Sequence, residues 1–304
     1  MAKKCRFCKG PLVYPEERLC AVHLAKYVEK RVDKVLEKVM GLKEKKLLVA
    51  VSGGKDSMGL AHLLSRKGLN LELLHIDLGI PCSSAPALTV VKAFAEARKL
   101  KLNVITLADW GFTVENLNNC QSLFKSNTCS LCGSVKRYLF NRFAHEQGFD
   151  FVVTAHNQDD IAAFAVMGIS AGDLRYTSKL EPISWPESER KTVGRIRPYF
   201  YVPEKVSLLY TLTQELPYHD GKCPYLTGNK QGDIKSALLQ METTSPGFRQ
   251  HLVKFVRKVP VSDSHLQVSS GQPNSCRVCG YPTAIDICRF CRICEGLSNQ
   301  SQHQ

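Results

Sequence analysis

The sequence lacks long hydrophobic runs. None of its apolar stretches approaches the roughly 18 residues that a membrane-spanning helix needs, and its first residues are polar and cysteine-rich, without the apolar segment of a secretion signal. These absences exclude a membrane-spanning chain and lead us to expect a cytoplasmic protein without a membrane partner. Acidic residues are also scarce, since 28 Asp and Glu stand against 41 Lys and Arg, which leaves a net charge of +13. Such an excess favours a polyanionic partner, with a solvated basic surface as the alternative.

Disulfide bonds alone do not account for the cysteines, because their number, 13, is odd. In a reducing compartment, grouped cysteines bind metal or do redox chemistry more often than they form disulfides. Two groups have the spacing of a four-ligand structural zinc site. Their members are Cys5, Cys8, Cys20 and His23, and then Cys276, Cys279, Cys288 and Cys291. We therefore predict two zinc ions, held by an N-terminal zinc finger over residues 1–26 and a C-terminal zinc finger over residues 272–295.

Between the fingers, residues 27–260 alternate between strand patterns and helix patterns. Strands are predicted over residues 46–51, 71–77, 103–107 and 149–154. Helices are predicted within residues 24–46, ending at Gly41, and over residues 56–67, 87–99 and 134–147. This alternation predicts one α/β catalytic domain with a doubly wound parallel sheet. Residues 261–275 have the composition of a linker, and residues 296–304 that of a frayed end.

A phosphate-binding loop is predicted directly after the first strand. It consists of Ser52, Gly53, Gly54, Lys55, Asp56 and Ser57. The glycines allow successive amide groups to face an anion, and the following helix N-terminus and Lys55 add positive charge. A ligand-free turn is the alternative. The string resembles the PP-loop of ATP pyrophosphatases, enzymes that split ATP between its α and β phosphates and adenylate an acceptor oxygen.

A cysteine pair and a carboxylate pair follow in the middle of the chain. Cys129 and Cys132 precede a predicted helix, whose dipole, together with Lys136, favours a thiolate. The pair alone fits half a zinc site, a redox pair or iron–sulfur ligands. With Cys223 as a third thiolate, an iron–sulfur cluster would keep one iron open. Asp159 and Asp160 follow a predicted strand and suit Mg²⁺, with a helix N-cap at Asn157 or Asp159 as the alternative.

The order of all these features, over residues 3–293, resembles the two-zinc-finger tRNA 2-thiouridine synthetases of the 2-thioribothymidine type. The resemblance implies that Cys129, Cys132 and Cys223 are catalytic and ligate a [4Fe–4S] cluster. It implies that ATP contacts the PP-loop residues Ser52 to Ser57, the backbones of Ala50 and Ile76, and the side chains of Lys136 and Asp160. Lys136 and Asp160 would also serve the adenylation step.

The same resemblance implies the substrate and the partners. We expect ATP-dependent thiolation at C2 of a tRNA uridine, at position 54 in the T loop rather than at anticodon position 34. A homodimer is expected, and in some members of the family a ubiquitin-like carrier with a C-terminal thiocarboxylate supplies the sulfur. Three alternatives stay open: thiolation of anticodon uridine 34 by the same fold, a persulfide on Cys132 or Cys223 without a cluster, and a non-catalytic zinc-dependent RNA-binding module. Ala155, where the family usually has glycine, and Ile161 depart from the family pattern.

Basic residues that could contact RNA gather in two places. Residues 190–201 combine arginine and lysine with aromatic side chains, and a second basic set runs from Arg249 to Lys258. Phosphate contacts gain free energy from counterion release, and exposed aromatic rings can stack on flipped bases. A solvated helix face or strand is the alternative for each.

Overall fold

The computed structural model describes residues 4–172, 180–187, 191–221, 223–226, 228–258 and 274–301. Within these residues a six-stranded sheet has the order β3-β2-β1-β4-β6-β5. The strands are β1 Leu47–Ala50, β2 Leu71–Asp77, β3 Leu102–Thr106, β4 Phe151–Val153, β5 Ile183–Ser184 and β6 Gly194–Ile196. All neighbours are parallel except β5, which runs antiparallel to β6. The predicted doubly wound parallel sheet is confirmed.

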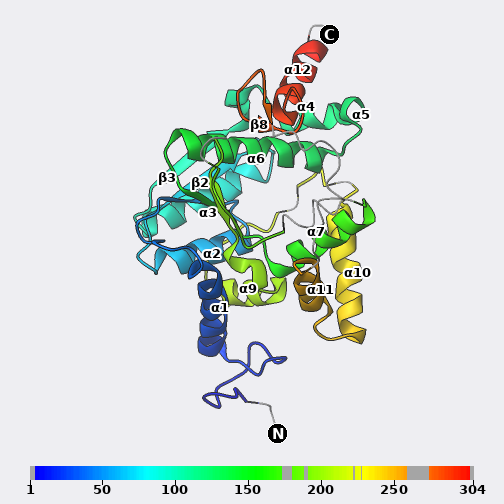
Figure 1. The fold of residues 1–304 in the computed structure, drawn as a ribbon. Helices are drawn as coiled ribbons and strands as arrows, with labels where there is room; N and C mark the ends of the chain where they lie inside the picture. Colours follow the sequence, from blue (N-terminus) through cyan, green and yellow to red (C-terminus); the bar gives the residue numbers. More distant parts are fainter. Residues whose placement is uncertain are drawn as a thin grey trace.

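Helices cover both faces of the sheet (Figure 1). The larger core lies on the face covered by α1 (Ala21–Leu36), α2 (Lys55–Ser65) and α9 (Glu204–Thr213), with α3 (Ser84–Ala97) beside β2. The opposite face packs against α6 (Thr128–Glu146). In β1, Leu47 and Val49 belong to the first core and Leu48 to the second. Burial on both faces explains why this strand is continuously apolar in sequence.

A third group of helices lies beside the end of the sheet that carries β6. It consists of α7 (Gln158–Ser170), α10 (Lys230–Thr244) and α11 (Phe248–Val256), which share an apolar core of their own. The remaining elements are η1 (Leu107–Trp110), α4 (Val114–Asn119), α5 (Gln121–Phe124), η3 (Pro198–Tyr201), the hairpin of β7 (Asn274–Ser275) and β8 (Pro282–Thr283), and α12 (Arg289–Ser301). No described helix is both long and apolar enough to cross a membrane.

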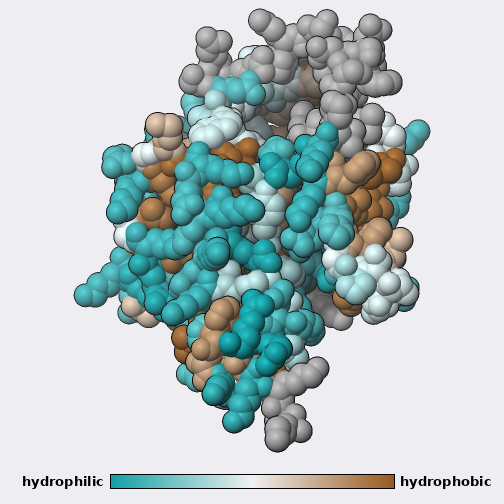
Figure 2. All heavy atoms as spheres, turned by 60° about the horizontal axis from the view of Figure 1, so that its bottom comes forward, coloured by the Kyte–Doolittle hydropathy of each residue, from teal (hydrophilic) through white to brown (hydrophobic). Residues whose placement is uncertain are grey.

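The two cysteine-rich ends lie at opposite ends of the molecule (Figure 1). The N-terminal segment precedes α1, and α12 stands beyond α6 on the far side of the sheet. Turned so that the N-terminal end comes forward, the molecule shows a mostly hydrophilic face with hydrophobic side chains in separate patches (Figure 2). On α1 the buried stripe leaves the charged side chains on the outside, as its sequence pattern predicts.

Two helix boundaries differ from the prediction. Helix α1 begins at Ala21 and ends at Leu36, well before Gly41, so that His23 is part of the helix. Helix α6 begins at Thr128 because the Asn127 side chain accepts a hydrogen bond from the Ser130 backbone N–H and caps the helix there. The predicted frayed end is wrong up to Ser301, since α12 extends to that residue. Most of the predicted linker, residues 261–273, lies outside the described residues.

Candidate active site

The predicted phosphate loop joins β1 to α2 at the carboxyl edge of the sheet. Gly53 has a φ of +82°, and an added Cβ atom would lie 3.0 Å from the Ala87 carbonyl oxygen, so both its conformation and its surroundings require glycine. The Ser57 hydroxyl donates to the Gly54 carbonyl (2.9 Å) and accepts from the Ser52 backbone N–H (3.2 Å). The loop is therefore closed by its own serines and leads directly into the N-terminus of α2.

A chain of ion pairs connects this loop with α7, α9 and α10. Lys55 Nζ lies 2.8 Å from Asp56 Oδ2 and 3.0 Å from Glu204 Oε1. The other Glu204 oxygen lies 2.9 Å from Lys235 Nζ, which in turn lies 2.6 Å from Asp160 Oδ1. Asp160, predicted from sequence to contact ATP, is thus linked to the phosphate loop through two residues that the sequence reasoning missed, Glu204 and Lys235.

Burial and charge act against each other in this chain of ion pairs. Burial raises the pKa of the Asp56 carboxyl above its ordinary value, although Lys55 counteracts this. Burial by itself would lower the pKa of the Lys55 ammonium, but the Asp56 and Glu204 carboxylates raise it. The Lys235 ammonium likewise has a raised pKa, because Asp160 and Glu204 outweigh its burial. Both lysines therefore stay charged.

The two carboxylates that follow β4 have separate partners. Asn157 caps α7 by accepting hydrogen bonds from the backbone N–H groups of Asp159 (3.0 Å) and Asp160 (3.1 Å). Asp160 Oδ2 accepts in return from the Asn157 N–H (3.0 Å). Asp159 accepts from Arg249 and, at 2.8 Å, from the Glu204 backbone N–H. In the structure, Asp159 therefore joins α7 to α9 and α11, while Asp160 faces Lys235.

Ala50 and Ile76, the predicted contacts of the nucleotide, lie near the carboxyl ends of the adjacent strands β1 and β2. The strands pair directly, with Ala50 opposite Leu74. His75 Nδ1 lies 2.8 Å from the Val51 carbonyl oxygen and ties the two strand ends together. Ligands of open α/β sheets bind at this edge. Ala155, where the resemblance expects glycine, is half-buried there against the main core.

The three mid-chain cysteines come together at the start of α6. The charges of Cys129, Cys132 and Cys223 interact with one another, and Lys136 interacts with the first two. Burial raises the pKa of the Cys129 and Cys132 thiols, so the predicted lowering by the helix dipole is wrong: the loss of water outweighs it. Within the part of the chain that the structure describes, these three cysteines do not form a compact ligand group like the two terminal sets.

The two terminal sets form compact ligand groups. In each, the four ligand atoms lie within 4.8 Å of one another. Cys20 Sγ is 3.3 Å from His23 Nδ1, and Cys279 Sγ is 3.7 Å from Cys288 Sγ. Zinc–sulfur bonds of about 2.3 Å in a tetrahedron place sulfur atoms about 3.8 Å apart. Both sets can therefore hold a metal ion, and the chemistry of their donors suits zinc.

The predicted basic patches are partly internal. Arg249 of α11 pairs with Asp159 of α7 and Glu242 of α10 and so holds three helices together. Arg257 pairs with Glu181 in the segment before β5. Arg190 lies outside the described residues.

Comparison with known proteins decides the family. Residues 24–220 match the PP-loop domain family. The tRNA-5-methyluridine(54) 2-sulfurtransferase of Pyrococcus horikoshii is 31% identical over 297 residues, which cover 95% of this chain and 93% of the relative. The enzyme of the same name from Thermus thermophilus is 35% identical over 288 residues, 93% of this chain and 87% of the relative. The chain belongs to the PP-loop family of these sulfurtransferases.

One solved structure resembles this PP-loop sulfurtransferase over almost its whole length. It is described as the U34-tRNA thiolase NcsA from Methanococcus maripaludis with its [4Fe–4S] cluster. The sequences are 26% identical, the TM-score is 0.78, and the likeness covers 97% of this chain and 96% of the other.

Proposed function

We propose that the protein is an ATP-dependent tRNA uridine 2-sulfurtransferase. The observation that carries the proposal is that two groups face the carboxyl edge of the sheet. The PP-loop is linked by ion pairs to Asp160. Lys136, beside the cysteines at the start of α6, acts through its charge on His156, which follows β4 at that edge. The relatives named above are sulfurtransferases acting on tRNA uridine, and the net charge of +13 suits a tRNA partner.

In the first step, uridine O2 attacks the α-phosphorus of ATP, and pyrophosphate leaves. The amides of residues 52–57 hold the phosphates together with Lys55, which exchanges a carboxylate partner for a phosphate oxygen. The backbones of Ala50 and Ile76 hold the nucleoside. Lys136 and Asp160 flank the reacting phosphorus, and Mg²⁺ accompanies the nucleotide. The product is a uridine adenylated at O2, whose C2 accepts a nucleophile and releases AMP.

In the second step, sulfur replaces the adenylated oxygen at C2. Cys129, Cys132 and Cys223 would hold a [4Fe–4S] cluster, whose chemistry when bound would be to hold a hydrosulfide as the nucleophile. Helix α6 fixes two of these cysteines and Lys136 on one rigid element, so that the sulfur and the adenylated carbon meet in a defined geometry. A persulfide on Cys132 or Cys223 is the alternative. The cluster of the solved relative favours the iron–sulfur form.

The remaining parts of the proposal concern position, partners and compartment. We propose position 54 because three relatives that are 30% or more identical carry that position in their names, while the solved relative is named a U34-tRNA thiolase. The terminal sets hold two zinc ions, by the ligand spacing given above. A homodimer and a thiocarboxylate carrier follow from the resemblance alone. A cytoplasmic location is supported by the name of a Drosophila relative, cytoplasmic tRNA 2-thiolation protein 1.

The test measures the two steps separately on anaerobically reconstituted protein with ATP, unmodified tRNA and sulfide. Pyrophosphate release reports adenylation, and mass spectrometry of nuclease fragments reports 2-thiouridine and its position. Cys129→Ala is expected to keep tRNA-dependent pyrophosphate release and lose thiolation, whereas Asp160→Asn is expected to lose both. Cys82→Ser, at an exposed thiol outside the three sets, is the matched control. Full thiolation by Cys129→Ala would refute the role of the cluster site, and no tRNA-dependent pyrophosphate release by the wild type would favour the RNA-binding module.

A further inference from the structure

The C-terminal cysteine set (Cys276, Cys279, Cys288 and Cys291) packs against α6, the helix that carries Cys129, Cys132 and Lys136. The ring of Phe290 stacks on that of Tyr138, with centroids 3.7 Å apart and planes at 9°. The Tyr138 hydroxyl also lies close enough to Cys279, a member of the set, for the two side chains to interact. Tyr138 of α6 is thus in contact with the candidate metal ligand Cys279. Its ring also packs against Phe290, which stands in the sequence between the candidate ligands Cys288 and Cys291.

A second contact reaches the first turn of α6. Arg289, which follows Cys288 and begins α12, donates to the hydroxyl of Ser126 (2.6 Å) and to that of Ser130 (3.3 Å). Ser130 stands between Cys129 and Cys132, and Ser126 stands just before the N-cap. Arg289 therefore binds one residue before the N-cap and one residue within the first turn. The Asn127 side chain holds the same turn by accepting a hydrogen bond from the Ser130 N–H (2.9 Å).

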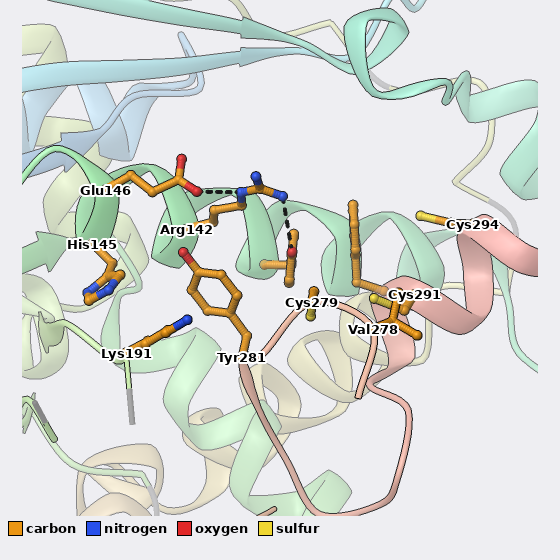
Figure 3. Close-up of a pocket in the computed structure, with 11 residues that line it drawn as sticks. Arg142, His145, Glu146, Lys191, Val278, Cys279, Tyr281, Cys291 and Cys294 are labelled. Carbon is orange, nitrogen blue, oxygen red and sulfur yellow. Dashed lines mark hydrogen bonds and ion pairs between the residues drawn. The ribbon is translucent and has the colours of Figure 1, made fainter. Parts of the chain in front are cut away.

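The contacts are concentrated where the cysteines lie. Leu131, Cys132 and Val135 share one apolar core with Cys276, Cys288, Phe290 and Cys291. Farther along α6, a cavity of about 610 Å³ lies between the helix and the C-terminal cysteine set (Figure 3). Its walls include Arg142, His145 and Glu146 from α6, and Val278, Cys279 and Tyr281 from the C-terminal segment. The contact is therefore tightest at the start of α6, from Ser130 to Val135, because Tyr138 already lines the cavity.

We propose that metal binding by the C-terminal cysteine set fixes the first turn of α6, and that Arg289 is the residue that positions Cys129 and Cys132. Arg289 lies between two ligands, so the metal determines where its side chain points. The inference rests on the proposed function, in which Cys129 and Cys132 are ligands of the iron–sulfur cluster. It assigns the C-terminal set a role in preparing the sulfur site, in addition to holding its own fold.

The test uses zinc-loaded full-length protein without an iron–sulfur cluster, so that it does not depend on cluster chemistry. Amide hydrogen exchange of residues 128–132 is compared in the wild type, Arg289→Ala, Arg289→Lys and Arg292→Ala. Arg292 is exposed on the same helix and serves as the control for the lost charge. All four cysteines remain in these variants, and zinc content and melting temperature verify that each is folded.

Arg289→Ala is expected to exchange about 3- to 10-fold faster in residues 128–132, as for the loss of exposed hydrogen bonds of ordinary strength. Arg289→Lys should recover part of the protection, and Arg292→Ala should match the wild type. Unchanged exchange in Arg289→Ala would overturn the proposal, whether or not the wild type takes up a cluster. After anaerobic reconstitution, Arg289→Ala should also lose iron to a chelator faster, by a similar factor. A wild type that binds no iron would instead contradict the cluster in the proposed function and leave the exchange result standing.

Discussion

Gly59 offers a sharp test of how α2 is held against α9. A Cβ atom at this position would lie 2.5 Å from Thr211 Oγ1 and 3.2 Å from the Tyr199 hydroxyl. Thr211 is fully buried and donates to the Lys55 carbonyl (2.9 Å), so it cannot rotate away without losing that hydrogen bond. In an open helix, Gly→Ala stabilises by about 0.8–1.0 kcal/mol. Here the overpacking costs about 1–3 kcal/mol and the disturbed hydrogen bond about 1 kcal/mol.

Gly59→Ala is therefore expected to lower the free energy of unfolding by about 1–3 kcal/mol, measured by urea denaturation. Gly133→Ala is the matched control, because its nearest neighbour is the flexible end of Arg137 at 3.3 Å. It should gain up to about 1 kcal/mol. Thr211→Ala in the Gly59→Ala background should restore part of the loss, because it removes the clashing oxygen. The reasoning fails if Gly59→Ala and Gly133→Ala are equally stable. Since Thr211 holds Lys55, Gly59→Ala should also raise the KM for ATP.

Three further predictions concern charge and metal. Burial, and then Arg197 and Arg195, lower the pKa of His156 to about 3. Because an unfolded histidine titrates near 6.5, only the unfolded chain takes up this proton between the two values, so stability falls as the pH drops below about 6.5. Urea midpoints at pH 7 and pH 5 should differ less in His156→Gln than in the wild type. Arg249→Met leaves the Asp159 and Glu242 carboxylates without their cation and should cost about 3 kcal/mol in urea unfolding, whereas Arg249→Lys should cost less; equal losses would contradict the geometry. Cys5→Ser should release the N-terminal metal and lower the melting temperature by roughly 5 °C. Because His23 lies on the first turn of α1, the circular-dichroism signal of helix should also decrease. An unchanged metal content would refute the assignment of Cys5 as a ligand.

Local patterns in the sequence predicted the central sheet well. The strand predicted over residues 71–77 is β2 with the same bounds, and the loop after β1 has the predicted place. Strand β6 was missed, because its three residues place Arg195 between Gly194 and Ile196 and form no apolar run. That segment had been interpreted as an RNA-binding patch, yet in the structure it pairs with β4.

Distant partners in the site could not be predicted in the same way. Glu204 meets Lys55 across 149 residues of sequence, and nothing near either residue specifies the other. The start of α6 was predictable in principle, since Asn127 is a favoured N-cap. The prediction instead placed the start at residue 134, after the two cysteines, whereas the helix begins at Thr128 and includes them. Partners were thus recovered where spacing along the chain defines them, as in the two terminal cysteine sets, and missed where only the fold brings them together.

The ion pairs around the phosphate loop have a consequence for nucleotide entry. Two ammonium groups, Lys55 and Lys235, face the three carboxylates of Asp56, Glu204 and Asp160, which gives this cluster a net charge of −1. A polyphosphate does not find unpaired ammonium groups in this cluster. It has to displace carboxylates that are already paired with Lys55 and Lys235. On the proposed function, ATP enters by exchange of partners, and the Mg²⁺ proposed above would neutralise the carboxylates that the lysines leave behind. ATP affinity should accordingly depend far more steeply on Mg²⁺ than the basic composition of the chain would suggest.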